Sequence, residues 1–241
     1  MKILDDIIST LDTNTAVKDI RQGLFYTGVL TRHCGLAATL PQDVLRQGHS
    51  LVARPGTLLD RGPLELAGMA YSASLLEAAI GMAAINSLVE IDEGSCRELN
   101  AGDLIAEKGV DKATLVIGHF PFVPRLKGVI SDLKVIEKNP VGDDYVESEA
   151  EGLVPEADVV AITGTAFTNH TIEKLLGLCN QRAYIIVLGG TAPMSEVLFD
   201  YGVDALSGTM VVEPELALRC VSQGANYRQI KGIRKLTMTR D

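Results

Sequence analysis

The chain has 241 residues, of which 46% are hydrophobic and 22% are charged, and its formal net charge at neutral pH is −9. Such a chain is long enough to bury a sizeable core in one large domain or two small ones. The acidic balance argues against a general affinity for nucleic acid or for an anionic membrane surface, because both need a basic face.

The N-terminal segment and the longest apolar run argue against export and membrane insertion. Met1–Ser9 contains Asp5 and Asp6, so it forms no apolar signal-peptide core. Leu75–Val89 is interrupted by polar residues and is shorter than the about 20 residues that a membrane-spanning helix needs. We therefore expect a cytoplasmic protein with no membrane partner.

The first part of the chain predicts a small antiparallel sheet. Val17–Leu30 and Thr31–Leu40 are rich in β-branched and aromatic residues and read as two extended segments around Thr27-Gly28. His49–Ala53 predicts a short third strand, which is followed by a turn at Arg54-Pro55-Gly56. We expect this sheet to pack on the helices that come after it.

Helical patterns follow the predicted sheet. Pro63 suits the first turn of a helix, and Leu64–Glu90 is rich in Ala and Leu. We predict two helices that are separated near Tyr71-Ser72. The second is apolar on almost every side, which is typical of a helix that other elements cover all round.

The cysteines offer little support for a metal site. Cys34, Cys96, Cys179 and Cys220 lie far apart, and no C-x-x-C pair exists, which excludes zinc-ribbon and thioredoxin-like motifs. His33 and Cys34 are adjacent, but neighbouring residues on a strand point to opposite faces and do not easily ligate one ion. We therefore assign no metal ligand.

After about residue 110 the pattern alternates between strands and helices. The short apolar runs that predict strands are Leu115–Ile117, Leu133–Glu137, Asp158–Thr163, Ala183–Leu188 and Ala205–Val211. The helical patterns are Glu147–Leu153, Thr171–Leu178, Ser195–Tyr201 and Glu213–Ser222. This alternation predicts a parallel sheet of at least five strands with helices on its faces. The two parts would meet in a short connection around Asn100–Asp111.

Glycines, hydroxyl side chains and a few charged residues follow the ends of these strands. They are Gly118-His119, Glu137, Thr163-Gly164-Thr165, Gly189-Gly190-Thr191 and Gly208-Thr209. In an open parallel sheet, ligands bind in the crevice outside the carboxyl ends of the strands, where helix N-termini offer N–H donors. Tight turns need glycines and hydroxyl caps even without a ligand, but the recurrence at one edge favours a binding site.

The residues after the first of these strands favour a flat ring over a dinucleotide. No G-x-G-x-x-G follows the strand, and Phe120, Pro121 and Phe122 crowd the turn where a pyrophosphate would approach the backbone. Glu137 ends the next strand, and its carboxylate is able to accept hydrogen bonds from neighbouring hydroxyls or from an N–C–N edge such as that of a pterin. An exposed glutamate without any ligand would give the same pattern.

These motifs resemble a known family. Gly118-His119-Phe120-Pro121, the strand end at Glu137, Thr163-Gly164-Thr165 with Asn169 and Thr171, and Gly189-Gly190-Thr191-Ala192-Pro193 are similar to DUF364, which is labelled “putative heavy-metal chelation”. The earlier stretches Gly35-Leu36-Ala37 and Glu77–Asn86 resemble DUF4213, a domain usually fused to it. The resemblance implies an α/β protein with two domains and a site in the cleft between them. Residues 1–105 would form an α+β enolase N-terminal-like domain, and residues 106–241 a Rossmann-like parallel-sheet domain.

The strand-end residues and the resemblance define one candidate site and two classes of function. The expected ligand-binding residues are Gly118, His119, Phe120, Glu137, Thr163, Gly164, Thr165, Asn169, Gly189 and Gly190. The first class is heavy-metal chelation or small-molecule binding, with a metal ion or a pterin-like or nucleotide-like ligand in the cleft. The alternative is an enzyme that acts on a cofactor-like substrate, with His119 and Glu137 as acid/base and anchoring groups, or with Glu77 in the place of Glu137. The expected partner is a small molecule or a metal complex, and no binding of nucleic acid is expected. The sequence leaves open whether the chain forms a homo-oligomer.

Overall fold

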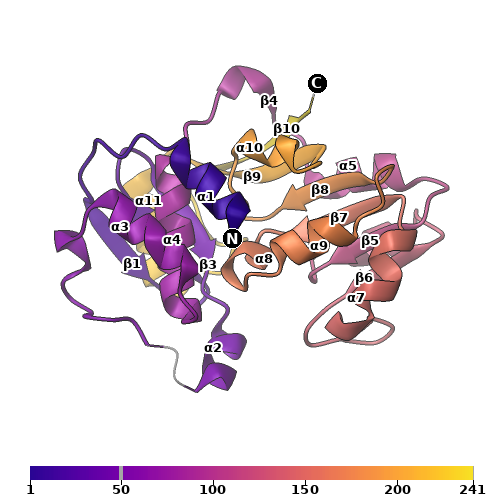
Figure 1. Ribbon diagram of the computed structural model, residues 1–241, viewed down its shortest axis with the longest axis horizontal. Helices are drawn as coiled ribbons and strands as arrows, with labels where there is room; N and C mark the ends of the chain where they lie inside the picture. Colours follow the sequence, from indigo (N-terminus) through magenta and orange to yellow (C-terminus); the bar gives the residue numbers. More distant parts are fainter. Residues whose placement is uncertain (49–50, 241) are drawn as a thin grey trace.

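The chain folds around two β-sheets. The computed structural model describes residues 1–48 and 51–240, and within them it contains a three-stranded and a seven-stranded sheet (Figure 1). This confirms the predicted α/β class, with a small antiparallel sheet in the first part and a mostly parallel sheet in the second. Among the described residues, no helix is both long and apolar enough to cross a membrane.

The larger sheet has a parallel centre, and its strands lie in the order β4-β10-β9-β8-β7-β5-β6. The five predicted strands are confirmed as β5 (Thr114–Ile117), β6 (Leu133–Ile136), β7 (Val159–Thr163), β8 (Tyr184–Leu188) and β9 (Ala205–Val211), which pair with one another in parallel. Two strands that the sequence did not predict, β10 (Ile233–Thr239) and β4 (Cys96–Arg97), extend the sheet beyond β9 in antiparallel pairing.

Helices cover both faces of this sheet, which explains why its central strands are apolar without alternation. On one face, α5 (Ala101–Gly109) and α6 (Val123–Lys127) share a core with Val116 and Ile186. The helices over the other face are α7 (Ala150–Leu153), α8 (Thr165–Thr168), α9 (Ile172–Leu178) and α10 (Val197–Asp200). These helices confirm the alternation of strands and helices.

The predicted connection at Asn100–Asp111 was wrong, because most of it is helix α5. The side chain of Asn100 caps this helix by accepting a hydrogen bond from the Gly102 amide at 2.8 Å. The buried side chains Leu104 and Ile105 then hold the helix on the sheet. The division of the chain at residues 105 and 106 falls inside this helix and stays a proposal.

The smaller sheet consists of β1 (Asp19–Gln22), β2 (Tyr26–Leu30) and β3 (Cys34–Ala38), all antiparallel. Val17–Leu30 was predicted as one extended segment, but it holds two strands, β1 and β2, with a turn at residues 23–25. Thr27 and Gly28 lie inside β2 and pair with Ala37 and Leu36 of β3. The predicted strand at His49–Ala53 lies partly outside the described residues, and residues 51–53 form no strand.

Four helices accompany the smaller sheet: α1 (Lys2–Ser9), α2 (Pro41–Gln47), α3 (Pro63–Gly68) and α4 (Leu75–Leu88). The predicted pair of helices is confirmed by α3 and α4, which a 3₁₀ turn at Met69–Tyr71 separates. Helix α4 packs against β2, β3, α3 and α8 at once, as its apolar surface requires. From the second part, α11 (Pro214–Ser222) returns and packs on β1 and β2.

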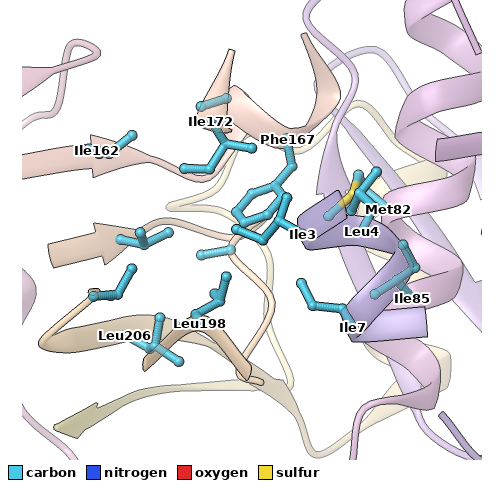
Figure 2. Close-up of a cluster of buried hydrophobic side chains, with 14 of the residues drawn as sticks. Ile3, Leu4, Ile7, Met82, Ile85, Ile162, Phe167, Ile172, Leu198 and Leu206 are labelled. Carbon is cyan, nitrogen blue, oxygen red and sulfur yellow. The ribbon is translucent and has the colours of Figure 1, made fainter. Parts of the chain in front are cut away.

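One hydrophobic core joins the two parts of the chain. It contains Ile3 from α1 and Ile85 from α4 together with Ile162 from β7 and Phe167 from α8. Figure 2 shows the ring of Phe167 beside Ile3, at the meeting point of helices from both parts. The relative position of the two sheets is therefore fixed by buried side chains.

Replacing Phe167 by alanine tests the importance of this shared core. Phe167 is fully buried, so Phe167→Ala should lower the free energy of unfolding by about 3–5 kcal/mol through lost burial and an internal cavity. Phe25, which is 39% exposed, provides the control, and Phe25→Ala should cost less than about 1 kcal/mol. Urea unfolding followed by circular dichroism measures both. Equal losses in the two variants would contradict the placement of Phe167.

Candidate functional site

The strand ends of the larger sheet open onto a pocket with a volume of ≈ 940 Å³. Its floor contains residues that follow β5, β7 and β8, among them His119, Thr165 and Gly190. Tyr26 of the smaller sheet forms part of its wall. The pocket therefore lies at the carboxyl edge of the larger sheet, where the sequence predicted a ligand, and Tyr26 of the smaller sheet contributes to its lining.

The charged side chains that line this larger pocket are all of one sign. Arg125, Arg228 and Lys235 lie on its wall, and none of the described residues that line it carries a carboxylate or a thiol. Arg125 also pairs with Asp103 at 2.6 Å, whereas Arg228 and Lys235 make no ion pair within the described part of the chain. In a chain with a net charge of −9, such a lining favours an anionic ligand.

Two pairs of aromatic rings also line the larger pocket. Tyr26 and Tyr227 stack with their ring centroids 5.7 Å apart, and Lys235 Nζ lies 5.0 Å from the centroid of the Tyr227 ring. Phe120 and Phe122 stack at 5.1 Å in almost parallel planes, 3° apart. The flat faces and the cations together suit a ligand that carries both a ring and a negative charge.

Gly190 is required by the tyrosine pair. A Cβ atom at this position would lie 2.9 Å from ring carbons of both Tyr26 and Tyr227, closer than real side-chain contacts allow. The glycine therefore lets the strand end after β8 pack directly under the rings. Burial raises the pKa of both tyrosine hydroxyls, and the Tyr227 hydroxyl lies 2.7 Å from that of Thr209.

A smaller pocket of ≈ 230 Å³ adjoins the larger one. The two share His119, Phe120, Thr163 and Thr165 as lining residues. Its other described lining groups have mixed charge, with the carboxylates of Asp43, Glu137 and Glu147 and the ammonium group of Lys138, and they include the amide of Asn169.

All ten predicted site residues line one of these two pockets. The larger pocket contains His119, Phe120, Thr163, Gly164, Thr165, Gly189 and Gly190. The smaller pocket adds Gly118, Glu137 and Asn169. The residues that sequence reasoning missed come from elsewhere in the chain, namely Tyr26, Arg125, Tyr227, Arg228 and Lys235, because no motif connects them to the strand ends.

Some of the polar strand-end residues also support their own turns. The hydroxyls of Thr163 and Thr165 lie 3.0 Å apart. Asn169 Oδ1 accepts hydrogen bonds from the Thr171 amide at 3.2 Å and from the Thr171 hydroxyl at 2.7 Å. The amide nitrogen of the Asn169 side chain has no partner among the described residues, so it stays free to donate into the smaller pocket.

The carboxylate next to His119 is neither of the two that the sequence suggested. Glu137 accepts a hydrogen bond from the backbone N–H of Lys138, and Glu77 accepts one from the Ser72 hydroxyl at 2.6 Å. His119 Nδ1 instead lies 3.2 Å from Oδ2 of Asp144. No sequence pattern predicts this pair, because it depends on how the chain turns back after β6.

Asn86, a polar residue in the apolar helix α4, holds the two parts together at the pocket. Its side-chain amide donates hydrogen bonds to the carbonyls of Leu36 at 2.8 Å and Thr191 at 3.1 Å. The Thr191 hydroxyl in turn accepts a hydrogen bond from the Ala38 amide at 2.9 Å. Asn86 therefore satisfies backbone groups of both parts and does not line either pocket.

The side chains that the structure describes do not form a preformed heavy-metal centre. Within residues 1–48 and 51–240, no three His, Cys, Asp or Glu side chains lie together as a metal-binding group. Burial raises the pKa of Cys34 to about 12 and that of Cys179 to about 11, which disfavours the thiolates that heavy metals need. His33 contacts Glu90 at 3.0 Å. Among the described residues, His119 is the one imidazole that lines the pockets.

Comparisons with known proteins identify relatives for almost the whole chain. The model of the DUF364 family, described as “Putative heavy-metal chelation”, matches residues 100–240, and that of DUF4213, with the same description, matches residues 4–89. An uncharacterized protein of Methanocaldococcus jannaschii is 26% identical over 242 residues, which cover 95% of this chain and 92% of that protein.

Two crystal structures of DUF364-family proteins of unknown function have the same fold. The protein from Desulfitobacterium hafniense has a TM-score of 0.86 and 25% identity, and the protein from Pyrococcus horikoshii has a TM-score of 0.84 and 24% identity. Each alignment covers 99% of this chain and 98% of the other chain. The arrangement of the two sheets is therefore shared along the full length of these proteins.

The family description can be tested directly with the isolated protein. The described residues contain no cluster of thiolates and imidazoles that would hold zinc. We therefore expect elemental analysis of the protein, after dialysis against metal-free buffer, to find no stoichiometric zinc. One firmly bound zinc ion per chain would contradict this expectation. If Cys34→Ser or His33→Ala then removed that zinc while Cys179→Ser did not, the metal would be located at the adjacent pair.

Proposed function

The chain belongs to the DUF364 family, and on this premise we propose that it binds a small organic anion with a flat ring in the cleft between its two parts. The ligand is pterin-like or nucleotide-like: its ring lies near Phe120 with a polar edge toward Glu137, and its anionic group lies among the cations of the larger pocket. The observation that carries the proposal is that the described lining of that pocket has three cations and no carboxylate.

The position of Phe120 supports a ligand with a flat ring. Phe120 lines both pockets, so a ligand that reaches from one pocket to the other passes the Phe120 side chain. Glu137 lies in the smaller pocket, where a carboxylate is able to accept two hydrogen bonds from an N–C–N edge. The free amide nitrogen of Asn169 offers a donor for a ring carbonyl or ring nitrogen beside it.

The positive charge of the larger pocket supports a ligand with an anionic group. Arg228 and Lys235 lie at the exposed rim of the larger pocket, and Lys235 already contacts the face of Tyr227. A carboxylate or phosphate at this rim would gain charge-assisted hydrogen bonds without displacing an existing ion pair of these two residues. The volume of ≈ 940 Å³ accommodates a molecule of nucleotide size.

The description of the family as a heavy-metal chelator is compatible with this ligand if the metal is bound as a complex. Soft metals prefer thiolate and imidazole ligands, and the pockets supply a single imidazole. In our proposal, a heavy metal enters the cleft as a complex with an organic anion that supplies most of its donors. The protein then recognises the ring and the charge of the chelator.

Guanosine monophosphate and guanosine are suitable probes, because they share a ring with an N–C–N edge and differ by the phosphate. Glu137→Gln replaces one acceptor oxygen with a donor amide and should weaken binding of both probes by about ten- to a hundredfold. Lys235→Met should weaken binding of the phosphate form alone, by about three- to tenfold, because an exposed cation contributes modestly. Isothermal titration calorimetry measures the affinities.

Matched controls separate local from general effects. Lys231→Met and Glu156→Gln make the same changes at exposed residues that line neither pocket, and they should leave both affinities unchanged. If neither probe binds the wild-type protein, or if Lys235→Met weakens both probes equally, the assignment of ring and phosphate to their pockets is wrong. Native mass spectrometry of the freshly purified protein then identifies any ligand that it retains.

A further inference from the structure

Asp144 is a buried carboxylate that lacks a full set of partners. Its side chain is 1% exposed. Oδ2 accepts a hydrogen bond from the Val141 amide at 3.2 Å and lies 3.2 Å from His119 Nδ1. Oδ1 has no hydrogen-bond partner among the described residues, and Lys127 Nζ is 3.8 Å away. A buried polar atom without a partner is costly, so its presence calls for an explanation.

The backbone fixes Asp144 next to His119. The residue after it, Tyr145, donates its N–H to Val135 O at 2.7 Å and accepts a hydrogen bond at its carbonyl from Glu137 N at 3.0 Å. These bonds hold the segment alongside the end of β6. Because β6 pairs with β5, they also place Asp144 beside the strand end that carries His119. The pair is therefore positioned by the sheet.

One ring nitrogen of His119, Nε2, is left to contact a ligand in the cleft. Nδ1 faces the carboxylate of Asp144, while Nε2 makes no hydrogen bond within the described residues. The side chain is 47% exposed and lines both pockets where they adjoin. A carboxylate beside Nδ1 favours the tautomer with the proton on Nδ1, which leaves the lone pair of Nε2 as a base.

We propose that His119 transfers protons to and from the molecule in the cleft and that Asp144 is the positioning residue that orients it. This inference rests on the proposed function for its ligand, an organic anion, and adds that the ligand carries a hydroxyl or amine at the junction of the pockets. In the step, the O–H or N–H bond of that group breaks and an N–H bond forms at Nε2. The electron pair stays on the oxygen or nitrogen, which becomes a nucleophile.

The resulting imidazolium faces Asp144, so its positive charge is balanced as it forms. Return of the proton from Nε2 restores the neutral ring, and the cycle requires no oxidant or reductant. The competing account is that Asp144 only supports the turn at Val141–Asp144 through its contact with the Val141 amide. Asp144→Asn separates the two accounts, because the asparagine oxygen is able to face Lys127 while the amide takes the place of Oδ2 beside His119 Nδ1. A role in orienting His119 then shows as a change of tautomer, whereas a role in the turn alone shows only as a change in thermal stability.

The test measures the tautomer of His119 by long-range proton–nitrogen correlation spectra of ¹⁵N-labelled protein, with His119→Gln to assign the signals. In the wild-type protein, the neutral ring should carry its proton on Nδ1. Asp144→Asn should move the proton to Nε2, because the asparagine amide is able to donate to Nδ1. Asp143→Asn is the matched control: this neighbouring carboxylate contacts Lys127 and should leave the tautomer unchanged.

Diethylpyrocarbonate, which acylates the free nitrogen of a neutral imidazole, gives a second measurement. Asp144→Asn should slow the modification of His119 at least about tenfold and leave that of His170 unchanged, since His170 contacts the Ala70 carbonyl instead. Guanosine monophosphate at saturation should protect His119 in the wild-type protein. A thermal melt confirms that each variant is folded.

The outcomes distinguish this inference from the proposed function. If His119 of the wild-type protein carries its proton on Nε2, or if Asp144→Asn leaves the tautomer unchanged, the role of Asp144 is overturned, and the wild-type spectrum decides this even if the variant does not fold. If guanosine monophosphate binds without protecting His119, the proton-transfer role is overturned. If guanosine monophosphate does not bind at all, the proposed ligand class is wrong. The tautomer of His119 still tests the interaction between His119 and Asp144 in that case.

Discussion

Helix α4 has almost no polar surface, and the arrangement of the whole molecule depends on covering it. Its residues from Ala78 to Ile85 are all buried. The helix contacts the smaller sheet on one side and α8 of the second part on another. On the side of the sheet the approach is so close that a Cβ atom at Gly35 would lie 2.1 Å from the Ala83 carbonyl oxygen. A helix of this kind does not remain in water, so neither part of the chain is expected to be stable alone.

The position of the cleft follows from this packing. Once α4 lies against α8, the smaller sheet is brought to the carboxyl edge of the parallel strands, and Ala38 at the end of β3 donates to Thr191 after β8. Tyr26 then reaches Tyr227, and the pocket is closed on that side by a ring from the first part. Ligands bind outside the carboxyl ends of the strands in an open parallel sheet, and here the smaller sheet adds the ring of Tyr26 to the pocket at that edge.

The parts of the fold that the sequence revealed are those where burial alone decides the structure. The central strands β5, β7 and β8 are almost entirely apolar and buried on both faces, so composition was enough to find them. β10 was missed because it lies at the border of the parallel region, where Arg234 and Lys235 interrupt the apolar pattern. The strand-end residues were found because a parallel sheet gathers its carboxyl ends. The positions of Asp144 and of the cations in the larger pocket depend on loops and on segments that are distant in the sequence. Hydrophobic periodicity does not predict such contacts.

The charge of the larger pocket limits the form in which a metal is able to enter it. A divalent ion about 8 Å from a single positive charge is repelled by about 1 kcal/mol even in water-like surroundings, and salt reduces this repulsion without reversing it. Arg228 and Lys235, which make no ion pair within the described residues, therefore oppose a bare cation, and no lining carboxylate among the described residues compensates for them. The same two cations attract a complex whose organic ligands give it a net negative charge. If the proposed function holds, selection in the cleft acts on the chelating molecule, and the donors of that molecule, rather than those of the protein, set the identity of the metal.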